Sequence, residues 1–219
     1  MKTITRAVWA RQKKVCDPEY ERAFAKDAKA RFSLNDLRRI YSQYKNEDSD
    51  FALIMRRIIF RAMCKALGDG VVLAPDVGMK HPETFKIGNQ VFIGSGSYLQ
   101  GRFDGTFSIG DHTWIGPHCY FDARALKIGN YVGIGPGTRV LTSEHTGLPV
   151  TIPILQTDLL TEAVVIKNEA DIGTGSILLK GVTIGKGSII GANSLVNRSI
   201  PDYAVAVGSP AKVIRFRKH

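Results

Sequence analysis

The sequence predicts an all-β solenoid built from six-residue repeats, preceded by a short basic helical region. An apolar residue recurs at six-residue spacing, with a few interruptions, from residue 87 to residue 196. The first third carries helix-capping patterns instead. Of the net charge of +10 on 219 residues, +8 lies in residues 1–66 and +2 in the rest. We therefore expect a helical region over residues 1–69 and a solenoid domain over residues 70–219, with a short C-terminal tail.

The composition, 44% apolar and 23% charged, is that of an ordinary folded protein. Three widely spaced cysteines without a CxxC motif favour a reducing compartment over a disulfide framework or a structural zinc site. No apolar run reaches the roughly 18 residues of a membrane span. Residues 1–14 are basic but lack the apolar core of a signal peptide. These features predict a cytoplasmic protein.

Two helices are expected first. One covers residues 18–30, with Asp17 as its N-cap and Pro18 as its first residue. The next begins at Ser33 and Asp36, which have the spacing of a capping box.

A third helix is expected over residues 51–67, ended by Gly68 and Gly70. Its apolar side chains alternate with basic ones. This pattern is typical of a helix that covers the open end of a solenoid core, or of one that lies on an anionic membrane surface. We favour the covering role and keep peripheral membrane contact as the alternative.

The repeat is strong in the remaining two thirds. All fifteen repeat units begin with an apolar residue, and nine of these are followed by Gly, although Gly makes up only 22 of the 219 residues. We expect each first residue to point inward and to stack on its equivalents in neighbouring coils. The units begin at Ile87, Ile93, Leu99, Ile109, Ile115, Phe121, Ile128, Ile134, Val140, Ile166, Ile172, Leu178, Ile184, Ile190 and Val196. Two weaker units, at Val71 and Val77, extend the series backwards.

The clearest units read IGSGSY, IGPGTR, IGKGSI and IGANSL, and the domain ends in VGSPAKVIR. Residues 70–215 thereby resemble the left-handed parallel β-helix acyltransferases, and in pattern the maltose, galactoside and polysaccharide-sugar O-acetyltransferases. The resemblance implies a left-handed β-helix with three hexapeptides per coil, a homotrimer, and acetyl-CoA as the acyl donor.

The repeat is interrupted by four residues before Ile109, by one before Ile128 and by twenty before Ile166. With three repeats per coil, all three interruptions fall at one corner of the prism, and so do four extra residues before Ile87. We expect one edge of the β-helix to carry the loops, including a long loop over residues 146–165, and to hold the functional site.

The longest loop follows the sequence TSEH at residues 142–145. In the acetyltransferases that the sequence resembles, a histidine here is the general base, and His145 matches it. An imidazole that titrates near neutral pH suits the removal of a proton from a sugar hydroxyl as it attacks a thioester. Glu144 is a candidate to orient this imidazole, and Asp122 and Glu162 are other candidates.

In the same family, coenzyme A lies in the groove between adjacent prisms, along the C-terminal coils. The residues that match its contacts in the galactoside-type enzymes are Thr174, Ala192, Asn197, Arg198, Lys212 and Arg215. Basic side chains suit its phosphates. The small residues of these coils also serve tight packing, and the last basic residues also suit a solvated tail.

No metal site is expected. A metal enzyme with this fold uses three histidines, but His112 and His118 occupy the same position of consecutive repeats and so lie on different faces. We expect Cys119 to be buried as a small core residue.

We therefore expect an acetyl-CoA-dependent O-acetyltransferase of a sugar hydroxyl, in bacterial lipopolysaccharide, capsule or exopolysaccharide synthesis, with direct acyl transfer. An N-acetyltransferase of a nucleotide-linked amino sugar is the alternative. A non-catalytic β-helix scaffold or a nucleic-acid binder is a third possibility from another class. The repeats lack the interleaved aromatic and basic residues of single-strand binders, so we expect no nucleic-acid partner.

Overall fold

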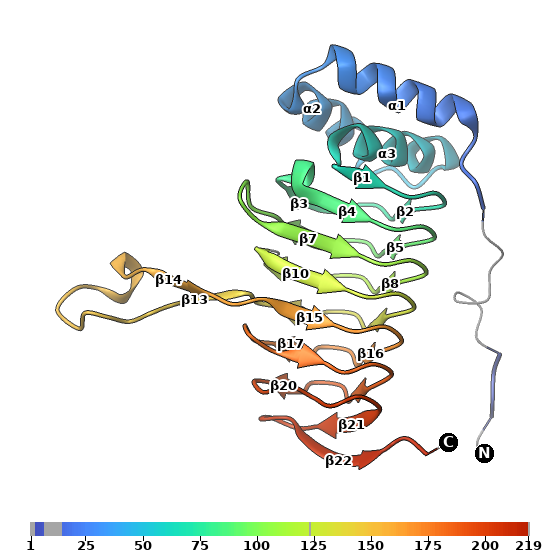
Figure 1. The fold of residues 1–219 in the computed structure, drawn as a ribbon. Coiled ribbons are helices and arrows are strands. Elements are labelled where there is room, and N and C mark those ends of the chain that lie inside the picture. The colour runs from blue at the N-terminus through green and yellow to red at the C-terminus, as the bar shows by residue number, and fades with distance from the viewer. Residues whose placement is uncertain (1–2, 7–14, 123, 219) are drawn as a thin grey trace.

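A left-handed parallel β-helix of about seven turns forms the body of the molecule, with three helices at its N-terminal end (Figure 1). This confirms the predicted fold class. The computed structural model describes residues 3–6, 15–122 and 124–218; most of the basic segment over residues 1–14 lies outside the described residues. Within the described part, none of the helices has the length and apolar character needed to cross a bilayer.

Three parallel sheets form the faces of the prism. The first sheet contains β1 (Ala66–Leu67), β4 (Phe85–Ile87), β7 (Thr106–Ile109), β10 (Ala125–Ile128), β15 (Val164–Ile166) and β18 (Thr183–Ile184). The second contains β2 (Val72–Leu73), β5 (Phe92–Ile93), β8 (Trp114–Ile115), β11 (Gly133–Ile134), β16 (Asp171–Ile172), β19 (Ile189–Ile190), β21 (Ala204–Val207) and β22 (Lys212–Phe216). The third contains β3 (Gly78–Lys80), β6 (Tyr98–Gln100), β9 (Tyr120–Asp122), β12 (Arg139–Val140), β17 (Ile177–Leu178) and β20 (Leu195–Val196). Within the described strands of these three sheets, β22 alone runs antiparallel to its neighbour, β21.

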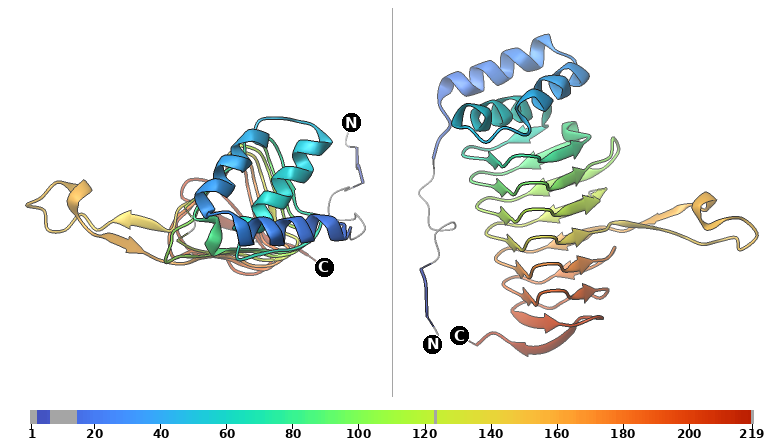
Figure 2. Two further views of the ribbon diagram at one scale, coloured as in Figure 1. Left: turned by 90° about the horizontal axis from the view of Figure 1, so that it is seen from above. Right: turned by 180° about the vertical axis from the view of Figure 1, so that it is seen from behind.

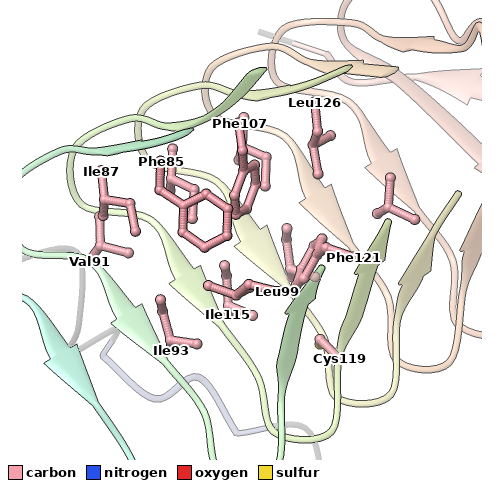
Figure 3. Packing of buried hydrophobic residues seen from close by; sticks show 14 of the residues in the cluster. Phe85, Ile87, Val91, Ile93, Leu99, Phe107, Ile115, Cys119, Phe121 and Leu126 are labelled. Atoms are coloured by element: carbon pink, nitrogen blue, oxygen red, sulfur yellow. The ribbon is translucent and has the colours of Figure 1, made fainter. Parts of the chain in front are cut away.

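The predicted repeat positions form the core. All fifteen first residues are buried, with at most 4% of their surface exposed. In the first sheet Ile87 pairs with Ile109, which pairs with Ile128, and the other two sheets repeat this pattern. Each coil therefore contains three repeats, as expected. Aromatic rings contribute to the core of the N-terminal coils, where the rings of Phe85 and Phe107 meet edge to face with their centroids 4.9 Å apart (Figure 3).

The two weaker units are shifted by two residues from their predicted starts. Leu73 pairs with Ile93 and Met79 pairs with Leu99, so these are the first residues of the two units. Val71 and Val77 are fully buried, but they occupy the inward position two residues earlier, where later units place a small side chain. The sequence prediction was wrong here because an apolar residue fits either inward position.

The three helices match the predicted order but differ at two ends. They are α1 (Glu19–Arg31), α2 (Leu34–Tyr44) and α3 (Asp50–Met63). Ser33 and Asp36 form the predicted capping box. Pro18, rather than Asp17, occupies the N-cap of α1, because the Asp17 carboxylate is turned inward. Helix α3 ends at Met63, before the predicted glycines, because β1 leaves it to join the first sheet.

The helices cover the open end of the β-helix (Figure 2). Helix α3 buries Ile58, Ile59 and Phe60 in the same apolar cluster as the first coils. Its arginines bind protein groups: Arg56 is 1% exposed and donates to main-chain carbonyls, including that of Leu73 at 2.9 Å. Arg57 pairs with the carboxylate of Glu21 at 2.7 Å, and Arg61 pairs with that of Asp17. The basic residues of α3 therefore hold the cap together, in agreement with the covering role.

Candidate functional site

All the interruptions of the repeat lie at the corner where the third sheet passes to the first. Three of them join β6 to β7, β9 to β10 and β12 to β15. The interruption before Ile87 joins β3 to β4 at the same corner, and it adds two residues rather than the predicted four because the preceding unit begins at Met79. The longest forms a two-stranded arm of β13 (Ser143–His145) and β14 (Leu159–Thr161), with the short helix η3 (Ile154–Gln156) near its tip. The arm projects far from the prism (Figures 1 and 2). The predicted loop-bearing edge is thus present, and the predicted loop over residues 146–165 is a hairpin that already begins at residue 143.

A cavity of about 680 Å³ lies between the base of the arm and the prism. Each of the three insertions contributes to its wall. Its lining residues are Arg102, Asp104 and Gly105 from the first, Arg124 from the second, and His145, Leu155, Thr157, Asp158, Leu159 and Thr161 from the third. Side chains that are far apart in the sequence therefore meet around His145.

The arm itself orients the imidazole of His145. The ring Nδ1 lies 3.0 Å from the main-chain carbonyl oxygen of Thr157. A carbonyl oxygen only accepts hydrogen bonds, so Nδ1 carries the proton and donates it. The neutral ring then keeps its lone pair on Nε2, which is the form that a general base needs.

Thr157 is in turn held by its hydroxyl group. Its side chain is buried, donates to the carbonyl oxygen of Ile154 at 2.7 Å, and accepts from the backbone N–H of Gly147 at 3.2 Å. These two hydrogen bonds connect Thr157, whose carbonyl faces His145, to both sides of the arm. Sequence reasoning missed Thr157, since it lies twelve residues after the histidine.

Glu144 points to a different partner. Successive residues of a strand face opposite sides, and the Glu144 carboxylate lies 3.1 Å from the ammonium of Lys180. The same ammonium lies 3.5 Å from the carboxylate of Glu162, at the other root of the arm. The hydrogen bond to Glu144 raises the pKa of Lys180. Lys180 therefore ties both roots of the arm to the coil below, while the imidazole of His145 is oriented by a carbonyl group.

Asp122, another candidate to orient the imidazole, lies beneath the arm. It is 6% exposed and accepts a hydrogen bond from the hydroxyl of Ser143 at 2.7 Å. Its second carboxylate oxygen faces the guanidinium of Arg124 at 3.4 Å. The sequence offered only one clue to Arg124, namely its place in the one-residue interruption.

The six predicted coenzyme A contacts are all exposed, and the structure gathers them in separate groups. Thr174 and Ala192 follow β16 and β19, at the corner where the second sheet meets the third. Asn197 and Arg198 follow β20, at the opposite edge of the third sheet. The remaining two are Lys212 and Arg215, which lie on β22. A single ligand can contact all six residues only if it crosses the third sheet or if two copies of the chain each supply some of the contacts.

His112, His118 and the buried Cys119 lie apart from this site. His112 and His118 occupy successive corners, and both have a φ of 57°. Among the described residues, no group of three or more His, Cys, Asp or Glu side chains is arranged to hold a metal ion. Cys119 is 1% exposed, and burial raises the pKa of its thiol to about 11. This agrees with its predicted packing role.

Comparison with known proteins places these features in context. No protein-family model matches the sequence. A probable acetyltransferase of Mycobacterium tuberculosis is 30% identical over 77% of this chain and 55% of its own length. The galactoside O-acetyltransferase of Lactococcus lactis is 34% identical over 56% of this chain and 61% of its own length. The alignments thus span only somewhat more than half of these curated relatives.

Two solved structures share the fold. A hexapeptide-repeat acetyltransferase of Vibrio cholerae, complexed with acetyl-CoA, aligns with a TM-score of 0.60 and 26% identity, over 84% of this chain and 89% of its own. An N-acyltransferase of Bacillus cereus, in complex with dTDP-4-amino-4,6-dideoxyglucose and coenzyme A, aligns with a TM-score of 0.65 and 25% identity, over 73% of this chain and 87% of its own.

Proposed function

We propose that this chain, which is similar to hexapeptide-repeat acetyltransferases, is an acetyl-CoA-dependent O-acetyltransferase of a sugar hydroxyl. The observation that carries the proposal is the position of His145 and the hydrogen bond that orients its imidazole. This residue lines the cavity of the loop-bearing edge, and the carbonyl of Thr157 leaves its Nε2 free to accept a proton.

The proposed reaction is a direct transfer. Nε2 of His145 takes the proton of the acceptor hydroxyl while the oxygen attacks the thioester carbonyl. A backbone N–H group stabilises the oxyanion that forms. As the intermediate collapses, the new carbon–oxygen bond is kept and the carbon–sulfur bond breaks. The imidazolium returns its proton to the leaving thiolate of coenzyme A.

Glu144 has a supporting part in this proposal. Through Lys180 it holds the root of the strand that carries His145, so it acts as a positioning residue rather than as a partner of the ring.

The donor is proposed to bind along the C-terminal coils, at Thr174, Ala192, Asn197, Arg198, Lys212 and Arg215. These residues lie at opposite edges of the third sheet and on β22, which supports a site shared between adjacent copies in a homotrimer. A role in polysaccharide synthesis in the cytoplasm completes the proposal.

The second candidate function is N-acetylation of a nucleotide-linked amino sugar. The similarity to an N-acyltransferase crystallised with a dTDP-amino sugar favours it. The linkage of the product separates the two candidates, because alkaline hydroxylamine cleaves an acetyl ester and leaves an acetamide intact.

The test measures thiol release from acetyl-CoA with a panel of sugars and amino sugars. We expect His145→Asn to lower kcat by roughly 10²–10⁴-fold, the usual contribution of a general base. His112→Asn is the matched control, because it makes the same substitution away from the cavity and Asn tolerates the positive φ of that position. Wild-type turnover in a correctly assembled His145→Asn protein would rule out the proposed base. Absence of thiol release with every acceptor, together with salt-sensitive nucleic-acid binding, would favour the non-catalytic class.

A further inference from the structure

A second cavity, of about 310 Å³, adjoins the cavity of His145 on the side of the helical cap. The two share Arg102 and Arg124, so together they form one groove along the loop-bearing edge. The second cavity is lined by Lys80, His81, Gln100, Gly101, Arg102, Phe103, Asp122 and Arg124.

Most charges along the groove are already paired. Arg124 faces Asp122 at 3.4 Å, and Arg102 pairs with Asp104. His81 Nδ1 lies 2.8 Å from the carboxylate of Glu83.

Lys80 differs from these residues. It is exposed at the end of β3 and has no ion-pair partner among the described residues. The cap-side end of the groove therefore presents one positive charge that none of the described carboxylates neutralises. The two guanidinium groups beside it each retain further N–H donors beyond those their carboxylates use.

The sheet register gives the distance from this charge to the reaction centre. Lys80 pairs with Gln100, and Gln100 pairs with Asp122, which lies beneath the strand of His145. Two strand spacings separate the backbones of Lys80 and Asp122, or about 10 Å at 4.8 Å per spacing. One hexose ring and a charged group attached to it fit this span.

We infer that the acceptor is an anionic sugar, whose phosphate or carboxylate binds at Lys80 while its reacting hydroxyl lies at His145. This inference rests on the proposed acetyl transfer and adds the chemical class of the acceptor. The charged group contacts the Lys80 ammonium and the free donors of Arg102 and Arg124. The sugar ring occupies the cavity of His145, whose lining includes the carboxylates of Asp104 and Asp158 as well as the two guanidinium groups.

Binding is tested by saturation-transfer NMR, with coenzyme A in excess so that donor phosphate sites are filled. The probes are methyl glucoside, glucose 1-phosphate, UDP-glucose and methyl glucuronide. We expect the anionic probes to bind roughly five- to tenfold more tightly than the neutral one, as a charge-assisted contact implies. Lys80→Gln should abolish this preference. Lys127→Gln, an exposed lysine of the first sheet outside the groove, should retain it.

Three results of this test support the inference and identify the source of the charge. Preference for the two phosphate probes indicates a glycosyl phosphate or nucleotide sugar, and preference for the glucuronide indicates a uronic acid. A preference for both kinds of anion indicates that charge alone is recognised. Equal binding of neutral and anionic probes, or an unchanged preference in Lys80→Gln, overturns the inference.

Thiol-release assays with the same probes show whether the acetyltransferase proposal or the proposed anion site at Lys80 has failed. Turnover of a neutral sugar without any preference for anions would leave the acetyltransferase proposal standing and refute the role of Lys80. Selective binding of anions at Lys80, without thiol release from any acceptor, would refute the transferase proposal and leave the anion site standing.

Discussion

The orientation of His145 can be tested through Thr157, whose hydroxyl holds the carbonyl that the imidazole binds. Thr157→Val keeps the shape of the side chain and removes its hydrogen-bonding oxygen. The carbonyl of Ile154 and the N–H of Gly147 then each lose a partner. We expect the backbone at Thr157 to become mobile and the imidazole to lose its single orientation.

The size of the effect follows from the two hydrogen bonds. A neutral hydrogen bond in a folded protein contributes about 1 kcal/mol net, so the two together contribute about 2 kcal/mol to the ordered arm. Since about 1.4 kcal/mol corresponds to a factor of ten, the ordered population can fall by at most roughly 30-fold. We expect a loss of roughly five- to thirtyfold in kcat/KM. The KM for acetyl-CoA should hardly change, because the proposed donor contacts lie on the C-terminal coils.

Thr157→Ser is the matched control, since it retains the hydroxyl group. Its kcat/KM should stay within a factor of about three of the wild type, because both hydrogen bonds can form. Nitrogen-15 NMR of the His145 ring gives an independent measurement. The wild type and the serine variant should show one tautomer, protonated on Nδ1, and the valine variant a mixture of two. Wild-type kinetics and a single tautomer in Thr157→Val would refute this account.

Three other predictions concern the arm, the cap and the core. Lys180→Met should speed hydrogen exchange in the arm and lower kcat/KM a few-fold, and Lys180→Arg should restore both. The hydrogen bond to Glu144 raises the pKa of Lys180 above its usual 10.5, so the protection of the arm should be constant from about pH 7 to 9 and be lost only as the pH rises through the raised pKa. Arg56→Met should destabilise the cap by about 3 kcal/mol in chemical denaturation, since it orphans buried carbonyls, whereas Arg39→Met, on the surface, should change little. Phe121→Ala should lower the unfolding free energy by about 3–5 kcal/mol, because a fully buried ring leaves a cavity that rigid coils cannot close.

The periodic part of the fold was predictable residue by residue. In a solenoid each repeat contacts its neighbours in the same way, so one local rule predicted that all fifteen first residues from Ile87 to Val196 lie in the core. The rule was ambiguous only at Val71 and Val77, where both inward positions of a unit carry apolar residues.

The helical cap was harder to interpret. The basic residues of the third helix were also compatible with an anionic membrane surface, yet Arg56 binds the main-chain carbonyl of Leu73 and Arg61 binds Asp17, a residue far away in the sequence. Amphipathic spacing identifies the buried face of a helix. It does not show which charged groups lie opposite it.

For the candidate site, as for the cap, the sequence predicted the position but not the hydrogen-bond partners. The interruptions of the repeat predicted the corner that carries the loops, and the loop that starts after His145 led to this residue as the proposed base. The partners of the base depend on how the arm folds back on itself. The carbonyl of Thr157 replaces the expected carboxylate, and Glu144 is directed to Lys180 by the alternation of side chains along β13.

The distribution of charge bears on how an anionic acceptor would be selected. The formal +8 of residues 1–66 suggests that the cap attracts anions, but Arg57 and Arg61 are neutralised there and Arg56 is buried. The arm leaves the prism between β12 and β15, at least three strands of the first sheet beyond β1, which amounts to about 14 Å. At physiological salt the screening length is about 8 Å, so exposed charges on the cap act only weakly at His145, whereas Lys80 lies on β3, in the first coil next to the cap. Added salt should therefore slow the association of anionic sugars with the protein, because it screens the long-range attraction of the cap. The wild-type protein, which retains Lys80, should still prefer anionic sugars to neutral ones. If instead neutralising exposed cap residues such as Lys26 and Arg39 abolished that preference at physiological salt, selection would reside in the cap and the contact at Lys80 would be dispensable.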